Sequence, residues 1–209
     1  MREINRRLLL SGVAALSLAA CNQAMGAKGG GGSNLGDEVV LGNPKAKVTV
    51  IEYASASCSH CAEFHRDTFD AFRKKYIDTG KIKFVFREFL TPPVQVAAAG
   101  FLLARCGGTK ERYFDVLGAF YRAQPEIYQS GDLRGPLVRI AQNMGMSEQQ
   151  MEACVRNEDS LKALNARVER ASQRDKIDST PTFVINGEKH PGVLTLEQLD
   201  ALIAKAQAS

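Results

Sequence analysis

Two cysteines stand three residues apart in the segment Cys58-Ser59-His60-Cys61. Thiols at this spacing can close into a small disulfide ring and open again. The segment follows a β-branched stretch typical of a strand and precedes a stretch typical of a helix. The free N–H groups at the start of that helix would stabilise a thiolate on the first sulfur. The sequence therefore predicts a redox-active dithiol in which Cys58 is the nucleophile.

The second cysteine and the histidine before it have different predicted roles. Cys61 lies about one turn further into the expected helix, beside Phe64, so we expect it to be buried. A buried Cys61 would attack only after a mixed disulfide has formed on Cys58, which makes it the resolving thiol. An imidazole of His60 that faced Cys58 would favour the thiolate further.

A cysteine pair at this spacing can also bind zinc, attach haem or form a structural disulfide. A zinc site needs four ligands, but the sequence has no second Cys-x-x-Cys, and its histidines are His60, His65 and His190. We expect His65 and His190 to be surface or packing residues. Haem attachment requires a histidine directly after the second cysteine, where Ala62 stands. We therefore expect no metal and no cofactor, and a purely structural disulfide stays open, because exported proteins are oxidised.

The elements around the dithiol indicate an α/β fold. Residues 47–53 are β-branched and mostly apolar, as in a buried central strand, and they follow a short strand at 39–41. A helix is expected over 58–76, and residues 81–86 alternate like a second strand. A β-α-β unit of this kind has a right-handed crossover, so its two strands are expected to be parallel.

A helical block follows, because every periodic segment between residues 93 and 175 is helical. The expected helices cover residues 94–106, 110–122, 133–144, 148–156 and 160–173. We expect two apolar stripes to form the block's own core, namely Leu102 with Leu103, and Phe114 with Leu117, Phe120 and Tyr121.

Strand character returns near the end of the chain. A strand at 182–185 leads into an Asn186-Gly187 turn, a strong hairpin signal, and a strand at 188–191. A last helix is expected over 196–206. The sequence thus predicts an α/β sheet with a helical block inserted in its middle.

The first twenty residues have the features of an export signal. Basic residues precede an apolar run that is shorter than the roughly 18 residues of a membrane helix. The run ends in Leu18-Ala19-Ala20-Cys21, which resembles the lipobox of bacterial lipoproteins, where the cysteine is lipidated. We therefore predict a lipoprotein signal over 1–20 and lipidation of Cys21. Ordinary signal cleavage and twin-arginine export stay open as alternatives.

Residues 21–36 are expected to form a flexible tether. They contain consecutive glycines and show no apolar periodicity. A Gly-rich coil of about 15 residues reaches roughly 20 Å, enough to hold a domain clear of a membrane surface. The folded part would then begin near Asp37.

The composition limits the classes of partner. The chain has 209 residues and a net charge of +4, and its basic residues form no cluster of the kind that binds nucleic acid. No apolar run is long enough to cross a bilayer. We therefore expect no nucleic-acid partner and attachment to a membrane through the lipid alone.

Two motifs give the chain a family resemblance. The segment Glu52-Tyr-Ala-Ser-Ala-Ser-Cys58-Ser-His-Cys61 is followed, after the helical block, by Ser179-Thr180-Pro181-Thr-Phe-Val-Ile-Asn-Gly187. Together they resemble the DsbA-like thiol:disulfide oxidoreductases of the thioredoxin superfamily. The match covers about residues 37–207, in order.

The resemblance implies roles for further residues. In that family a cis proline packs opposite the dithiol, which falls on Pro181, and the residue before it, here Thr180, pairs its backbone with substrate peptide. The family's buried acid, six residues before the first thiol, falls on Glu52. A plain edge-facing carboxylate is the alternative for Glu52. Ser59 stands where the best-known members have proline, and this dipeptide tunes the oxidising strength.

Cys106 and Cys154 remain when Cys21 is lipidated and Cys58 and Cys61 are redox-active. Each lies near the end of an expected helix, and they form a second disulfide or stay two separate buried thiols. A subset of DsbA-like proteins carries such a pair, so the resemblance supports the disulfide.

The resemblance also implies a domain plan and a function. The thioredoxin-fold domain would comprise residues 37–92 and 176–209, with the helical insertion at 93–175. The expected protein is a monomeric dithiol oxidase, tethered in the periplasm or cell envelope. It would oxidise reduced secreted proteins and be reoxidised by a membrane partner, in the family a quinone-linked oxidase. The alternatives are a disulfide isomerase, a thiol reductant, or a lipoprotein that binds peptide or metal without turnover.

Overall fold

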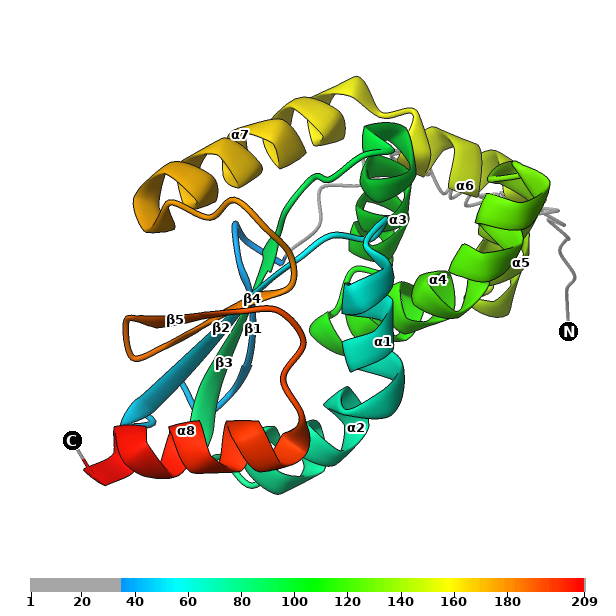
Figure 1. The fold of residues 1–209 in the computed structure, drawn as a ribbon. Helices are drawn as coiled ribbons and strands as arrows, with labels where there is room; N and C mark the ends of the chain where they lie inside the picture. The colour runs from blue at the N-terminus through cyan, green and yellow to red at the C-terminus, as the bar shows by residue number, and fades with distance from the viewer. Residues whose placement is uncertain (1–34, 209) are drawn as a thin grey trace, which may run out of the picture.

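A five-stranded mixed sheet forms the centre of the computed structural model, which describes residues 35–208 (Figure 1). The strand order is β1-β3-β2-β4-β5. The strands are β1 (Val39–Gly42), β2 (Val48–Ala54), β3 (Ile82–Glu88), β4 (Thr182–Ile185) and β5 (Glu188–Pro191). β2 and β3 are parallel, and the other neighbours are antiparallel. The predicted α/β fold is therefore confirmed, with β2 as its central strand.

The dithiol segment starts the helix that follows β2. This helix is α1 (Ser59–Asp67), which continues into α2 (Phe69–Phe72) and the π-helical turn η1 (Arg73–Ile77). The single helix expected over 58–76 is wrong in this detail. At Thr68 the backbone leaves the helical region, with φ −123° and ψ −37°, so the chain changes direction before α2.

Five helices lie between β3 and β4, and one follows β5. They are α3 (Val94–Cys106), α4 (Lys110–Ser130), α5 (Arg134–Asn143), α6 (Glu148–Val155), α7 (Glu158–Asp175) and α8 (Leu196–Ala208). Local signals set several boundaries, as in the capping box that Ser147 and Gln150 form at the start of α6. The expected end of the second helix at residue 122 is wrong, because α4 passes through Pro125 and ends at Ser130.

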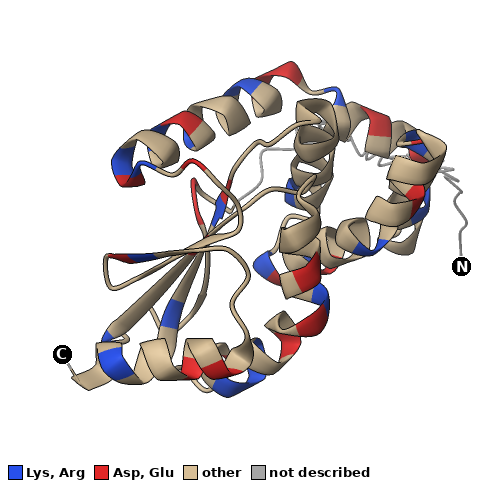
Figure 2. Ribbon diagram, viewed as in Figure 1, with Lys and Arg blue, Asp and Glu red and all other residues tan. Residues whose placement is uncertain are grey.

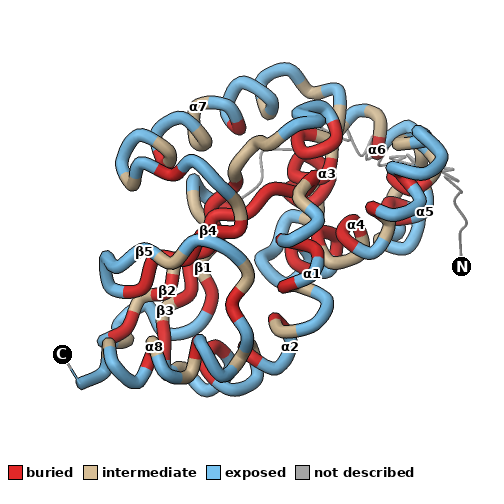
Figure 3. The backbone as a smooth tube through the Cα atoms, viewed as in Figure 1, coloured by how far each residue is buried: buried red, intermediate tan, exposed pale blue. Residues whose placement is uncertain are grey.

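The two apolar stripes of the helical block do not form a separate core, contrary to our expectation. The ring of Phe114 lies 5.4 Å from that of Phe69 in α2 and 5.5 Å from that of Phe86 in β3. Figure 3 shows buried residues in the sheet and in α1, α3 and α4, and these residues belong to one apolar cluster. The insertion and the sheet therefore share one core, because α4 packs directly on α1.

Helix α7 is attached differently. Its buried residues are Leu164 and Ala171, and most of its length is exposed in Figure 3. It carries many charges of both signs (Figure 2). Ion pairs therefore supplement the small apolar contact that α7 makes with the second face of the sheet.

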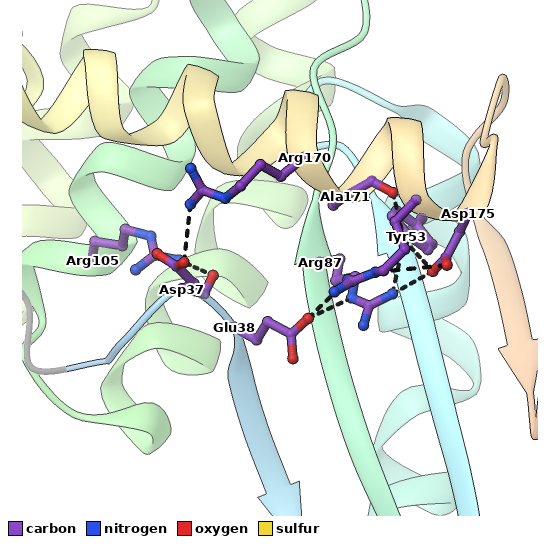
Figure 4. A network of polar contacts seen from close by, with 9 residues as sticks. Asp37, Glu38, Tyr53, Arg87, Arg105, Arg170, Ala171 and Asp175 are labelled. Carbon is purple, nitrogen blue, oxygen red and sulfur yellow. Dashed lines mark hydrogen bonds and ion pairs between the residues drawn. The ribbon is translucent and has the colours of Figure 1, made fainter.

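Those ion pairs form a network that joins α7 to the beginning of the described chain (Figure 4). Arg87 in β3 contacts Glu38, Tyr53 and Asp175. The hydroxyl of Tyr53 donates to the carbonyl of Ala171 at 2.9 Å. Arg170 and Arg105 bind the segment before β1, through Asp37 and through the carbonyls of Gly36 and Asp37.

The membrane-related predictions fall mainly on residues before this point. The signal at 1–20, lipidation at Cys21 and almost the whole tether lie outside the described residues. Within residues 35–208, none of the helices has both the length and the apolar character that crossing a bilayer requires.

Candidate active site

The dithiol lies at the junction of β2 and α1. Cys58 is the N-cap residue of α1, with an extended backbone, and its side chain is partly buried. Cys61 is completely buried one turn later. Both cysteines are free thiols in the structure. A nucleophile must reach solvent, so the geometry gives Cys58 that position and leaves Cys61 behind it.

The surroundings of Cys58 favour its thiolate. The thiol of Cys61 donates a hydrogen bond to it, and the backbone N–H groups of Cys61 and His60 add to this effect at the start of α1. Burial opposes them, but the net result lowers the pKa of Cys58 from its ordinary 9.0 to about 5. Cys58 is therefore a thiolate at neutral pH.

The surroundings of Cys61 favour its neutral thiol. Burial is the main reason that the pKa of Cys61 is raised well above 9.0, and the neighbouring sulfur of Cys58 adds to it. The charge of Glu52 acts in the same direction. A weak hydrogen bond from the backbone N–H of Ser55, at 3.5 Å, opposes them. The two sulfurs thus differ sharply in acidity.

The imidazole of His60 is not directed at Cys58, which corrects our expectation. Its side chain is 70% exposed, and Nδ1 lies 3.3 Å from a carboxylate oxygen of Glu63. The two residues are three apart on α1, so their side chains share one face of the helix. The contribution of His60 to the acidity of Cys58 comes from its backbone N–H.

The loop before β4 lies against the dithiol. The Sγ atom of Cys58 is 3.3 Å from the carbonyl oxygen of Thr180. The peptide bond between Thr180 and Pro181 is cis in the structure, and so is the bond between Pro92 and Pro93, which we did not expect. The structure therefore brings together Cys58 and the Thr180-Pro181 pair, which are distant in sequence.

Glu52 lies in the central strand β2 and is fully buried, so the edge-facing alternative is wrong. Both of its carboxylate oxygens contact Nε2 of His65, at 2.9 and 3.1 Å. The side chain of His65 is only 4% exposed. His65 is therefore a packing residue, as one of our two expectations held, but its pairing with Glu52 was missed.

Helix α4 supplies two further residues that the sequence analysis missed. Gln124 is buried and donates from Nε2 to the carbonyls of Ala56 and Cys58, at 2.7 and 3.2 Å. The hydroxyl of Tyr128 donates to the carbonyl of Ser57. Both residues hold the loop that presents the nucleophile. They were missed because α4 was expected to end at residue 122, although the buried positions Gln124 and Ile127 continue its helical periodicity.

Cys106 at the end of α3 and Cys154 in α6 are joined by a disulfide in the structure. His190 lies in β5, with its Nε2 3.8 Å from a carboxylate oxygen of Glu188. No group of three or more His, Cys, Asp or Glu side chains within residues 35–208 is arranged to bind a metal ion.

The sheet, the inserted helices and the acidic first thiol together define a DsbA-like class of thiol:disulfide oxidoreductase, and three comparisons agree. A family model described as thioredoxin matches residues 34–205. The chain belongs to the thioredoxin superfamily, among its DsbA-like members. Its similarity to individual proteins extends over most of the described residues.

A Rickettsia typhi protein that carries the name "Putative protein-disulfide oxidoreductase" is 35% identical over 151 residues, which are 72% of this chain. The crystal structure of alpha-DsbA1 from Wolbachia pipientis has a TM-score of 0.73 and 30% identity, covering 83% of this chain and 94% of that one. Oxidised BdbD from Bacillus subtilis shares the fold, with a TM-score of 0.70 at 22% identity, covering 85% of this chain and 96% of that one. The aligned part is 55% of the length of the Rickettsia typhi relative.

Proposed function

We propose that this protein is a dithiol oxidase, which donates a Cys58–Cys61 disulfide to reduced secreted or envelope proteins. The observation that carries the proposal is the difference between the two sulfurs. The pKa of Cys58 is lowered to about 5, while that of Cys61 is raised well above 9.0. A stabilised Cys58 thiolate makes the reduced form favourable, and a favourable reduced form makes the disulfide a stronger oxidant.

The reaction consists of two exchanges. A substrate thiolate attacks Sγ of Cys58, the Cys58–Cys61 bond breaks, and Cys61 leaves with the electron pair and takes up a proton. A second substrate thiolate then attacks the substrate sulfur of the mixed disulfide, and Cys58 leaves as a thiolate. Two electrons have moved from the substrate to the enzyme. One substrate proton is on Cys61 and the other is in solvent.

The surface around Cys58 supports binding of an extended peptide. The backbone of Thr180 lies beside Sγ of Cys58, where a substrate strand can pair with it. Tyr128 is 44% exposed and is bonded to the loop residue Ser57. An exposed aromatic ring next to a reactive sulfur is suited to contact apolar side chains of an unfolded substrate.

The cellular setting belongs to the same proposal. The export signal at 1–20, lipidation at Cys21 and the tether at 21–36 would hold a monomeric domain at a membrane in the periplasm or envelope. A membrane redox partner would restore the disulfide there. The boundaries of the two-part thioredoxin domain, 37–92 with 176–209, and of the insertion at 93–175 are proposed on the same basis.

The reduction potential of the dithiol tests the direction of electron flow. The protein is equilibrated in glutathione buffers, its thiols are trapped, and its proteolytic peptides are analysed by mass spectrometry. Fluorescence is not used because the chain has no Trp to report the change. We expect a value of about −120 to −150 mV, near that of DsbA. A value of about −250 mV or below, near that of thioredoxin, would make the protein a reductant and refute the oxidase.

A second experiment separates turnover from simple binding. Cys58→Ser removes the nucleophile and leaves Thr180 and Tyr128 in place. We expect this variant to bind a reduced peptide but to oxidise none of it. Unchanged function in the variant would instead favour a lipoprotein that binds peptide without turnover.

A further inference from the structure

Cys61 must exchange a proton in every catalytic cycle, yet it has no direct contact with solvent. When the Cys58–Cys61 bond breaks, Cys61 leaves as a thiolate at a position that is 0% exposed. Burial strongly disfavours that charge, so a proton has to reach this sulfur during the exchange. The face of the molecule that carries Cys58 is covered by substrate at that moment. A route from another side is therefore needed.

The buried pair of Glu52 and His65 lies on such a route. The charge of Glu52 acts on Cys61, and both oxygens of Glu52 contact Nε2 of His65. His65 in turn lines a surface cavity of about 370 Å³ formed by α1, α2, η1 and α4. The described lining of this cavity includes neither Cys58 nor Thr180. His65 therefore connects Glu52 with a surface cavity whose described lining is separate from the residues proposed to meet the substrate.

An imidazole is suited to this position because it gains and loses a proton near neutral pH and has two nitrogens. In His65 one nitrogen is committed to Glu52, and the ring lies between aromatic neighbours that fix its orientation. Its centroid is 4.9 Å from that of Tyr121 and 4.5 Å from that of Phe69. A ring held in this way can pass a proton without rotating.

We propose that His65 is a positioning residue for proton transfer, which carries protons between the cavity and Glu52 and so supplies Cys61 when it leaves. The inference rests on the proposed function, since it concerns the same dithiol. One proton enters at His65, one passes to Glu52, and one passes from Glu52 to Cys61, so the pair returns to its starting state after each transfer. Reoxidation reverses the direction.

Other titratable groups surround His65 and enter the expected pH dependence. The hydroxyl of Tyr121 is buried and has no hydrogen-bond partner within the described part of the chain. Burial, followed by the charges of Cys61 and Glu52, raises the pKa of Tyr121 well above 10.0, so it stays neutral and can donate. The charged residues that line the cavity with His65 are Arg66, Asp70, Arg73, Asp115 and Arg122.

The test measures the rate at which glutathione attacks the oxidised protein. Samples are quenched with acid, and the glutathione adduct is quantified by mass spectrometry. This single step releases Cys61. His65→Gln keeps an amide that can bond to Glu52 but cannot carry a proton. The ratio of the variant rate to the wild-type rate at each pH removes the titration of glutathione itself, which is the same for all samples.

We expect His65→Gln to react about 10- to 100-fold more slowly near pH 6. The deficit should change with pH, because the wild-type imidazole can exchange a proton and the amide of the variant cannot. His190→Gln is the matched control, since His190 lies in β5 and contacts Glu188 instead. Its rate should equal that of wild type at every pH. A ratio for His65→Gln that is the same at all pH values would overturn the proposal.

A second variant keeps the test informative if His65→Gln does not fold. Glu52→Gln interrupts the same route and should show the same pH-dependent deficit. In the double variant the rate should be no lower than in the slower single variant, because residues that act as a unit are not additive. If the rate deficit of the double variant equalled the product of the two single deficits, the two residues would act independently. That result would refute proton transfer through His65 and Glu52 as one route, which we call the relay.

The potential and the rate ratio distinguish failure of the two proposals. A low reduction potential with a pH-dependent ratio refutes the oxidase and retains the relay. A high reduction potential with a rate ratio that is the same at every pH supports the oxidase and refutes proton transfer through His65.

Discussion

Two buried carboxylates lie on the same face of neighbouring parallel strands, and they have very different partners. Glu88 ends β3 and accepts hydrogen bonds from Arg105, Arg167 and Tyr113, at 2.7 to 3.1 Å. Among the described residues, the hydrogen-bond partner of Glu52 in β2 is His65. Both acids are less than 5% exposed. The same residue type is thus held by permanent charges in one place and by a titratable ring in the other.

The difference indicates what each acid is for. A guanidinium cannot give up its proton in a protein, so the Glu88 cluster has one charge state and ties β3 to α3 and α7. Burial is the largest single influence on the pKa of Arg105 and acts to lower it, but the charge and the hydrogen bond of Glu88, together with smaller contributions from Tyr113 and Asp37, leave the net pKa raised. An imidazole does exchange its proton, so Glu52 has a partner that can transfer a proton during a reaction. We infer that Glu88 serves the fold and Glu52 serves the chemistry.

The largest expected effect comes from neutralising the structural acid. Glu88→Gln removes the carboxylate that pairs with the buried guanidinium of Arg105, and we expect the free energy of unfolding to fall by about 3 to 5 kcal/mol. Glu52→Gln leaves no guanidinium unpaired and should cost less than about 1 kcal/mol. Urea unfolding of both variants measures the contrast.

The exchange rates should show the reverse order. Glu88→Gln should keep the wild-type rate with glutathione per folded molecule, whereas Glu52→Gln should be slow. Equal losses of stability in the two variants would contradict the division between a structural and a chemical acid. Asp67→Ala, which removes one partner of an exposed ion pair, is the surface control and should leave the free energy of unfolding nearly unchanged.

The disulfide lies next to the Glu88 cluster, since Cys106 follows Arg105 directly in α3. Cys106 and Cys154 are 48 residues apart in sequence. Replacing both by Ala should lower the free energy of unfolding by about 4 kcal/mol, through the larger entropy of the unfolded chain. The reduction potential of Cys58 and Cys61 should not change. A shifted potential would show that the two sides are coupled.

A smaller effect on the free energy of unfolding is expected from Cys58, through which the stability of the reduced protein should depend on pH. The pKa of Cys58 is about 5 in the folded protein, below the roughly 8.5 of an unfolded thiol. The thiolate therefore stabilises the reduced protein fully above about pH 8.5, and this stabilisation is lost as the pH falls to about 5. Partial exposure of Cys58 screens its charge and limits the size of the effect.

Urea unfolding at pH 5, 7 and 8.5 checks this prediction. The reduced protein should gain stability relative to the oxidised protein as the pH rises, because the oxidised protein has no thiolate. If the free energy of unfolding changed equally with pH in the reduced and the oxidised protein, the pKa of Cys58 would not be lowered by folding.

Much of the fold could be predicted from local patterns. Apolar and β-branched runs located β2 and β3, and capping residues such as Ser147 located helix starts, because these signals depend on near neighbours in sequence. The extent of α4 was also present in the sequence, since buried positions continue with helical spacing beyond Pro125. The ring of Pro125 is exposed, so the proline removes one backbone bond without disturbing the buried face.

The site was only partly predictable. The spacing of Cys58 and Cys61 indicated the chemistry, but the contact of Glu52 with His65 depends on how closely α1 packs on β2. No local pattern contains that distance. The orientation of His60 could have been predicted, because Glu63 stands three residues later on the same helix face and competes for the imidazole.

The smallest expected effects concern Tyr128, which contributes to both sides of the comparison. Its hydroxyl donates a hydrogen bond to the carbonyl of Ser57, and the residue is 44% exposed. Tyr128→Phe removes only the hydroxyl, so we expect a loss of about 0.5 to 1.5 kcal/mol in the free energy of unfolding. The KM for a reduced dithiol peptide should stay the same, because the ring remains.

Tyr128→Ala removes the ring as well, and the KM for the same peptide should rise roughly two- to tenfold, as expected for loss of one aromatic contact. The rate with glutathione should not change beyond the effect of Tyr128→Phe, since glutathione is too small to need the ring. Leu161→Ala is the matched control, because Leu161 is 38% exposed on α7 and has no place in the proposed site. If Leu161→Ala raised the KM as much as Tyr128→Ala, the peptide would be bound by exposed apolar side chains in general. If Tyr128→Phe raised the KM as much as Tyr128→Ala, the hydroxyl and not the ring would account for the contribution of Tyr128 to substrate binding.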